Sequence, residues 1–189
     1  MKKQLSISRT LLTVVILTVP AYAADNTNPY YISGNIGAAF LNDITLKNST
    51  KQIQTGTNPF VQGALGRNFD RYRCEIEFAF QRPKATQIGS FTVSSVLING
   101  YYDFPLAGVA PYLTAGAGYE YSGGDNQYVN SAGGGYQFGA GIDIPVTKTV
   151  VIDARYRYFG TSTVGFGDNR GDFKLSGSSF LIGLKFGIK

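Results

Sequence analysis

From Tyr30 onward, apolar and polar side chains alternate with a period of two, the spacing of a β-strand whose two faces meet different surroundings. In segment 71–81, one face carries tyrosine, cysteine, isoleucine and phenylalanine, and the other carries mostly arginine, glutamate and glutamine. The pattern recurs in segments of about ten to fourteen residues. It predicts strands at 30–41, 57–69, 71–81, 91–104, 111–122, 134–144 and 150–159, and a last strand through 180–189.

The connections between these strands alternate strictly between short and long. Short connections lie at 70, 105–110 and 145–148, and longer polar, glycine-containing ones lie at 42–56, 82–90, 123–133 and 160–176. Tight periplasmic turns and long extracellular loops are typical of an outer-membrane barrel. We therefore expect an all-β fold, an eight-stranded antiparallel up-and-down transmembrane β-barrel.

The polar faces of these strands are rich in glycine, alanine, serine and glutamine, which suits the narrow interior of an eight-stranded barrel. The apolar faces carry aromatic residues towards both strand ends, as expected of a bilayer-facing surface. At the periplasmic level we expect Tyr30, Tyr72, Tyr102, Phe104 and Tyr112. Towards the outside we expect Phe40, Phe80, Tyr119, Tyr121, Tyr136, Tyr156 and Tyr158. A soluble secreted binding module, with the apolar faces inward, is the alternative.

Residues 1–23 resemble a secretory signal peptide, with Lys2, Lys3 and Arg9, an apolar run at 11–19 and an Ala-Tyr-Ala end. That run is shorter than the ~20 residues of a spanning helix, which favours cleavage over a retained anchor. We expect 24–189 to form a single barrel domain. The chain's net charge of +5 falls to +2 without the leader's three basic residues, and the remaining charges are scattered singly. This distribution argues against nucleic-acid binding.

The chain contains no histidine and one cysteine, which excludes histidine-based triads, zinc sites and CxxC pairs. No phosphate-binding glycine motif occurs, and the aspartates near 168–172 do not have the spacing of an EF-hand calcium loop. We therefore expect no catalytic residues, no cofactor and no metal.

Charged residues on the polar faces would be enclosed together in the lumen. These residues are Arg73, Glu75, Glu77, Glu120, Asp143, Asp153, Arg155, Arg157 and Lys185. Enclosed charges must be paired or solvated. Counting from the turns places Glu77 level with Arg155, Glu120 near Arg157, and Glu75 and Asp153 at the depth of Arg73 and Lys185. Two alternatives remain open: a salt-bridged plug, and a gated pore in which the pairs exchange partners.

Two outward positions stand apart from the apolar pattern. Arg67 falls on the lipid side, so it must either snorkel to the periplasmic boundary or mark a register shift at a bulge. Cys74 would face lipid as a small apolar side chain.

Four segments carry a family resemblance: 30–34 (YYISG), 110–118 (APYLTAGAG), 136–143 (YQFGAGID) and 153–158 (DARYRY). In this order they resemble the opacity-type, OmpA-like eight-stranded outer-membrane proteins, including their surface-antigen branch. The resemblance implies a monomer in the outer membrane of a Gram-negative bacterium, surrounded by lipid and lipopolysaccharide and inserted by the outer-membrane insertion machinery. It also implies adhesion to host-surface or serum proteins through the loops.

We take a non-enzymatic surface protein with a largely closed lumen as the first functional hypothesis, and a narrow or gated porin-like channel as the second. The loops would carry ligand contacts in the first case. The candidate ligand residues are Lys47, Lys51, Arg82, Lys84, Asp125, Asp168, Arg170 and Lys174.

Overall fold

The structure, a computed structural model, describes residues 28–42, 44–45, 52–53, 57–82, 84–85, 89–104, 106–124, 131–161, 164–165, 172–173 and 176–189. Eight long strands form its wall: β1 (Tyr30–Leu41), β4 (Thr57–Phe69), β5 (Tyr72–Gln81), β7 (Gly89–Asp103), β8 (Ala110–Gly124), β9 (Ser131–Pro145), β10 (Val150–Thr161) and β13 (Ser176–Ile188). The expected signal peptide, 1–23, lies outside the described residues.

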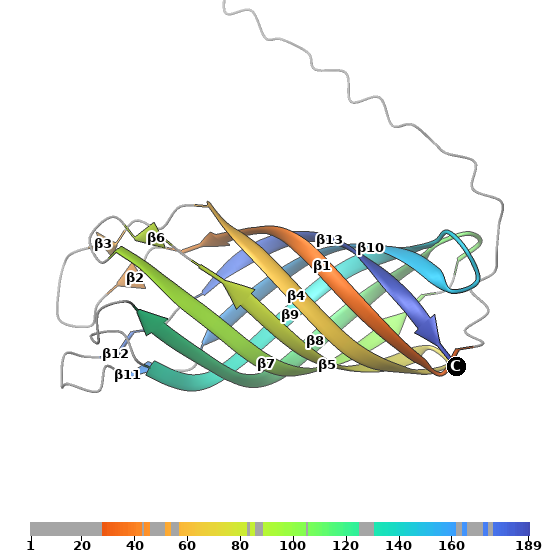
Figure 1. Ribbon diagram of the computed structural model, residues 1–189, viewed down its shortest axis with the longest axis horizontal. Coiled ribbons are helices and arrows are strands. Elements are labelled where there is room, and N and C mark those ends of the chain that lie inside the picture. Colours follow the sequence, from red (N-terminus) through yellow and green to blue (C-terminus); the bar gives the residue numbers. More distant parts are fainter. Residues whose placement is uncertain are drawn as a thin grey trace, which may run out of the picture.

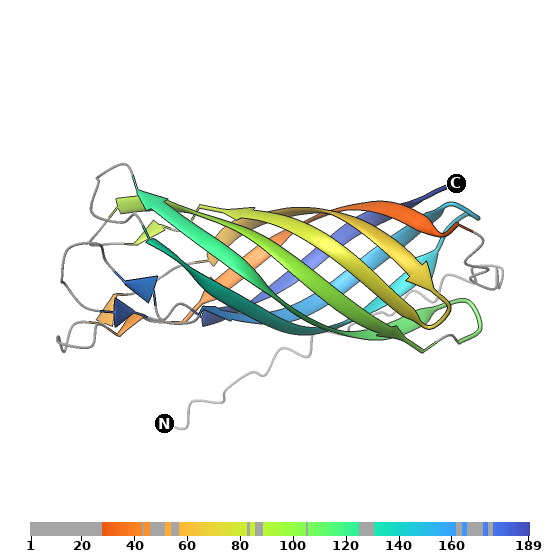
Figure 2. The ribbon, with the colours of Figure 1, turned by 90° about the horizontal axis from the view of Figure 1, so that it is seen from below.

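The eight strands close into a barrel in which every pairing is antiparallel. β1 pairs with both β4 and β13, and the pairing of β5 with β7 completes the ring. Following paired residues around the ring from Tyr30 leads back to β1 at Phe40, ten residues further along. This stagger tilts the strands, and Figures 1 and 2 show them crossing the barrel diagonally. The expected fold class is confirmed.

Three short turns lie at one end of the barrel, together with the C-terminus (Figure 1). Asp70 joins β4 to β5 with a positive φ of 57°, and Gly108 has a φ of 82° in the turn between β7 and β8. In the turn between β9 and β10, the Thr147 hydroxyl accepts hydrogen bonds from the backbone N–H groups of Thr149 and Val150. Tight turns are periplasmic in outer-membrane barrels, so this end is the periplasmic one.

Short strand pairs lie in the regions expected to be loops. β2 (Ile44–Thr45) pairs with β3 (Gln52–Ile53), β6 (Lys84–Ala85) pairs with β7, and β11 (Val164–Gly165) pairs with β12 (Asp172–Phe173). The long strands β7, β8 and β9 also extend further into these regions than the sequence predicted. Among the described residues, no helix is long and apolar enough to span a membrane.

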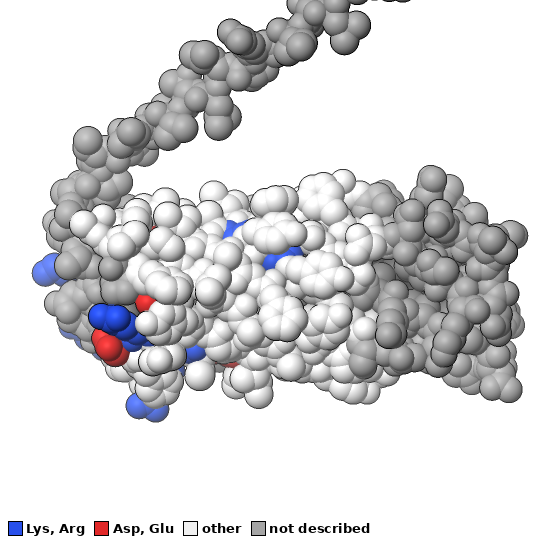
Figure 3. Space-filling model, turned by 180° about the vertical axis from the view of Figure 1, so that it is seen from behind, with Lys and Arg blue, Asp and Glu red and all other residues white. Residues whose placement is uncertain are grey.

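The side chains are arranged inside out relative to a soluble barrel. Ile98, on the outer face of β7, is 67% exposed, whereas Glu77, on the inner face of β5, is fully buried. In Figure 3 the wall of the barrel is almost wholly uncharged, and acidic and basic atoms gather at the periplasmic end. The apolar faces therefore point outward, as expected for strands in contact with acyl chains.

Glycines on the inner face make room for large lumen side chains. A Cβ at Gly66 would collide with the ring of Tyr31, and one at Gly141 would collide with the hydroxyl of Tyr112. Tyr112 is only 1% exposed and lies in the lumen, so its expected position on the lipid face was wrong. The alternation that turns Thr114 inward also turns Tyr112 inward, and its hydroxyl is hydrogen-bonded there.

Candidate functional site

The lumen holds a continuous network of buried charged and polar side chains. All nine charged residues expected there are buried in the barrel interior, and Asp103, at the end of β7, joins them. The lumen therefore contains six carboxylates and four cationic side chains among the described residues. Carboxylates outnumber cations, so some carboxylates must be held by neutral donors.

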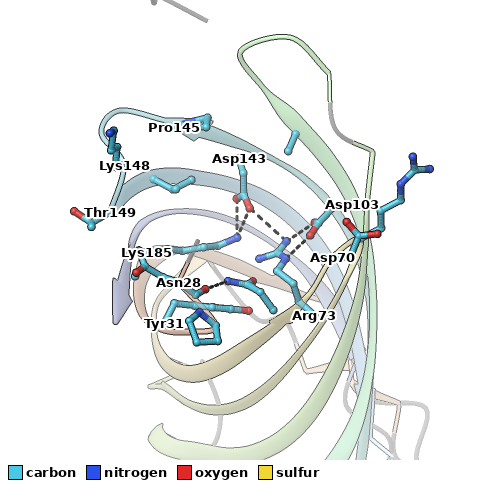
Figure 4. A pocket seen from close by; sticks show the side chains of 16 residues that line it. Asn28, Tyr31, Asp70, Arg73, Asp103, Asp143, Pro145, Lys148, Thr149 and Lys185 are labelled. Atoms are coloured by element: carbon cyan, nitrogen blue, oxygen red, sulfur yellow. Dashed lines mark hydrogen bonds and ion pairs between the residues drawn. The ribbon is translucent and has the colours of Figure 1, made fainter. Parts of the chain in front are cut away.

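The first layer lies at the periplasmic mouth and is drawn in Figure 4. Arg73 forms a two-pronged ion pair with Asp103, with Nε–Oδ2 and Nη2–Oδ1 distances of 2.7 and 2.8 Å. Its Nη2 also lies 3.4 Å from Oδ2 of Asp143, which in turn accepts hydrogen bonds from Lys185 Nζ at 2.5 and 2.7 Å. Four charges from four strands thus bridge the width of the lumen. Asp103 was not among the residues predicted to line the lumen, although its place next to Phe104, an outward residue, puts it on the inner face.

The second layer surrounds Asp153. This carboxylate accepts hydrogen bonds from Asn35 Nδ2 at 2.7 Å, from Arg155 Nη2 at 3.1 Å and from the Tyr112 hydroxyl. Arg155 Nε donates to the same Tyr112 hydroxyl at 2.9 Å. Tyr112 therefore links Asp153 to Arg155. Its expected place on the lipid face did not predict this role.

Glu75 shows how neutral donors hold a buried carboxylate in the lumen. Its Oε1 accepts a hydrogen bond from the Tyr31 hydroxyl at 2.8 Å, and its Oε2 accepts one from the Tyr101 hydroxyl. Both tyrosines are buried and also lie beside Arg73, whose guanidinium carbon is 5.9 Å from the Tyr31 ring centroid and 4.5 Å from that of Tyr101. Hydrogen bonds to the charged form keep a buried carboxylate stable.

The third layer is built around Glu77. Arg157 Nη1 donates to Glu77 Oε1 at 2.7 Å, while Asn99 Nδ2 and Gln137 Nε2 donate to Oε2 at 2.8 and 3.2 Å. Arg155 Nη1 is a further cation 3.7 Å from Oε2. Glu77 is therefore shared by two arginines, whereas counting from the turns had placed only Arg155 at the level of Glu77.

The expected approach of Glu120 to Arg157 does not produce an ion pair within the part of the chain that is described. Arg157 is directed to Glu77 and Gln137 instead. Glu120 is buried near the extracellular end, and its Oε2 has no hydrogen-bond partner among the described residues. Gly135 on β9 leaves the space that this side chain fills.

An apolar cluster lies on one side of the lumen, on the neighbouring strands β5, β4, β1 and β13. It consists of Ala39, Phe60, Ala79 and Leu181, all buried. The Arg157 guanidinium carbon lies 4.2 Å from the centroid of the Phe60 ring, so the ionic network and the apolar cluster are in direct contact.

A pocket of about 500 Å³ opens at the periplasmic mouth (Figure 4). Its lining includes the turn residues Asp70, Arg71 and Lys148 and the buried pair Arg73 and Lys185. The first ionic layer forms the inner end of the pocket. Among the described residues, no group of three or more histidine, cysteine, aspartate or glutamate side chains is arranged to hold a metal ion.

The outward residues that stood apart from the pattern are placed without a bulge. Arg67 pairs with Tyr30 on one side and with Cys74 on the other in an unbroken register. Both Arg67 and Cys74 are exposed on the outer face. Arg67 therefore lies on the lipid side near the periplasmic boundary, and the alternative of a register shift was wrong.

The structure describes two of the candidate ligand residues of the loops. Arg82 is exposed at the end of β5, and the backbone of Lys84 forms part of β6. The remaining candidates, Lys47, Lys51, Asp125, Asp168, Arg170 and Lys174, lie outside the described residues. Their role stays a prediction from the sequence.

Comparisons with known proteins agree with this architecture. The chain is 26% identical over 117 residues to outer membrane protein PagN of Salmonella typhimurium, covering 50% of this chain and 49% of PagN. It thus spans about half the length of that relative. The crystal structure of Neisserial surface protein A superposes with a TM-score of 0.64 at 19% identity, covering 85% of this chain and 97% of that one. OprG from Pseudomonas aeruginosa superposes with a TM-score of 0.57 at 12% identity, covering 85% and 96%.

The model of the family described as outer membrane protein beta-barrel domain matches residues 10–186, nearly the whole chain. The inside-out barrel, its tight turns at one end and this match lead to one conclusion. The chain is a small barrel protein of the Gram-negative outer membrane and belongs to the outer membrane protein beta-barrel family.

Proposed function

We propose that this protein is a non-enzymatic surface barrel whose extracellular loops bind ligands outside the cell, while its lumen stays closed. The observation that carries the proposal is the filling of the lumen. Three ionic layers, ending at Glu77 with Arg157, and an apolar cluster around Phe60 occupy the lumen. A barrel closed in this way offers its loops, rather than its interior, for recognition.

The loops hold charges of both signs with a basic excess. Lys47, Lys51, Arg170 and Lys174 are examples of this excess, which favours anionic ligands such as glycans or lipopolysaccharide. Host-surface or serum proteins are the corresponding partners in an adhesion role. Neisserial surface protein A, whose barrel has a similar fold, is named as a surface protein, which agrees with such a location.

Trimming the loops tests this proposal. One variant has 42–56 replaced by a short hairpin turn, and a second has 160–176 replaced in the same way. The control has the periplasmic turn 145–148 replaced by another turn of the same length. Bacteria expressing each variant are compared for attachment to cultured host cells and for capture of serum proteins. We expect the first or second variant to lose binding and the control to keep it. Binding that survives all three replacements would contradict the proposal.

A narrow gated channel is the second candidate function, and one observation favours it. Glu77 is shared by Arg157 at 2.7 Å and Arg155 at 3.7 Å, so it has two cations between which an ion pair could exchange. Single-channel recordings in planar bilayers decide between the two functions. A silent wild type and a silent Glu77→Ala variant support the closed surface barrel. Openings in the wild type that change in frequency with Glu77→Ala support the channel.

A further inference from the structure

Arg67 is the one charged residue on the outer faces of the eight long strands, within the residues that the structure describes. The other outward positions carry apolar, aromatic or small uncharged side chains. A charge placed among acyl chains is costly at the bilayer midplane and much less so near the interface. Arg67 lies near a strand end, where polar lipid groups are within reach and can act as its partner.

The surroundings of Arg67 are aromatic. Its guanidinium carbon lies 5.3 Å from the ring centroid of Tyr30, the residue directly opposite on β1, and 4.8 Å from that of Phe69 on its own strand. Both rings are about half exposed, so they share the lipid-facing surface with the arginine. No carboxylate of the described residues lies within ion-pair distance of it.

The depth of this cluster follows from the turn. Asp70, at the tight turn between β4 and β5, is three residues after Arg67, and Tyr72 follows on the outer face of β5. Aromatic residues at this level seat their rings at the boundary between acyl chains and headgroups. A side chain as long as arginine can reach the lipid phosphates of the periplasmic leaflet from this level.

The chemistry of a guanidinium selects the partner. Cation–π contact occupies the face of the group, whereas its five N–H donors lie in its plane and form a fork that matches phosphate oxygens. We propose that Arg67, flanked by Tyr30 and Phe69, is a binding site for the phosphate of a glycerophospholipid in the periplasmic leaflet. The aromatic rings fix the orientation of the guanidinium, and the acyl chains of the bound lipid lie along the outer faces of β1 and β4. This site does not depend on the function proposed for the loops.

Native mass spectrometry of the full mature chain, released from detergent, tests the site. The protein is titrated with phosphatidylglycerol and with diacylglycerol that has the same acyl chains but no phosphate. We expect the wild type to bind the first phosphatidylglycerol about five- to tenfold more tightly than diacylglycerol, the range of one charge-assisted contact. Arg67→Gln should remove this preference, and Arg67→Lys should keep part of it because the charge remains.

Arg71→Gln is the matched control, because it removes an equal charge from the adjacent turn without touching the aromatic pair. It should keep the full preference for phosphatidylglycerol. Heat-dependent gel mobility verifies that each variant is folded. Equal affinity of the wild type for the two lipids, an unchanged preference in Arg67→Gln, or an equal loss in Arg71→Gln would overturn the proposal.

Discussion

Arg157 and Glu77 join opposite walls of the barrel through a 2.7 Å ion pair. Arg157 lies on β10 and Glu77 on β5, and each of these strands is the fourth from the other in both directions around the ring. The contact therefore spans the diameter of the lumen. Arg155 also approaches Glu77, at 3.7 Å, but its nearer carboxylate is Asp153 at 3.1 Å.

Removing the Glu77 carboxylate should destabilise the barrel strongly. Glu77→Ala leaves Arg157 without an ion-pair partner among the described residues, whereas Arg155 keeps Asp153 at 3.1 Å. Breaking a buried pair in this way costs about 3–5 kcal/mol. The free energy of unfolding is measured by urea titration in lipid vesicles, followed by the heat-dependent gel shift. Glu120→Ala is the matched control, since Glu120 forms no ion pair with Arg157 in the described part of the chain. Equal losses in the two variants would contradict this account of the network.

Space opposite the lumen tyrosines should also matter for stability. Gly66→Val places a branched side chain where the Tyr31 ring lies, so the ring must move and its hydrogen bond to Glu75 is lost. We expect a loss of about 1–3 kcal/mol in unfolding free energy. Gly34→Val is the control, because no atom lies within 4 Å of a Cβ at Gly34. A value for Gly66→Val as small as that of the control would mean that the ring has free space around it.

The period of two determines which side chains point inward, but it leaves open which of them pair with one another. The inner or outer direction of Arg73, Glu77 and Ile98 follows from alternation alone, and so does the number of long strands. Partner choice does not follow, because long side chains reach across the lumen to non-neighbouring strands. Arg157 could therefore be placed near Glu120 by depth, yet it binds Glu77.

Tyrosine was the second source of error, because its ring suits a lipid boundary and its hydroxyl suits a buried network. Tyr112 was expected at the boundary and lies in the lumen. The sequence did contain a clue in the glycines of neighbouring strands. Gly141, paired with Tyr112 in the register of β8 and β9, provides the space that an inward ring needs.

The Tyr112 hydroxyl should contribute measurably to stability. It donates to Asp153 and accepts from Arg155, so Tyr112→Phe leaves both buried ions with one partner fewer. We expect a loss of about 1–3 kcal/mol in unfolding free energy. Tyr119→Phe, on the outer face of the same strand, should stay within about 0.5 kcal/mol of the wild type. If Tyr112→Phe were as stable as Tyr119→Phe, the Tyr112 hydroxyl would contribute nothing measurable to the stability of the network.

The outer face of β7 provides a direct test of its surroundings. Ile98 lies near the middle of this strand and Thr92 near its extracellular end, both on the outer face. Acyl chains make arginine unfavourable by about 2–4 kcal/mol at the midplane and by about 0–1 kcal/mol near the interface. Ile98→Arg should therefore destabilise the folded protein in vesicles, and Thr92→Arg should hardly do so. If water covered this face, both arginines would be tolerated, since exposed substitutions usually change stability by less than about 0.5 kcal/mol. The difference between the two variants thus measures the depth of the bilayer along one strand, independently of the charges inside.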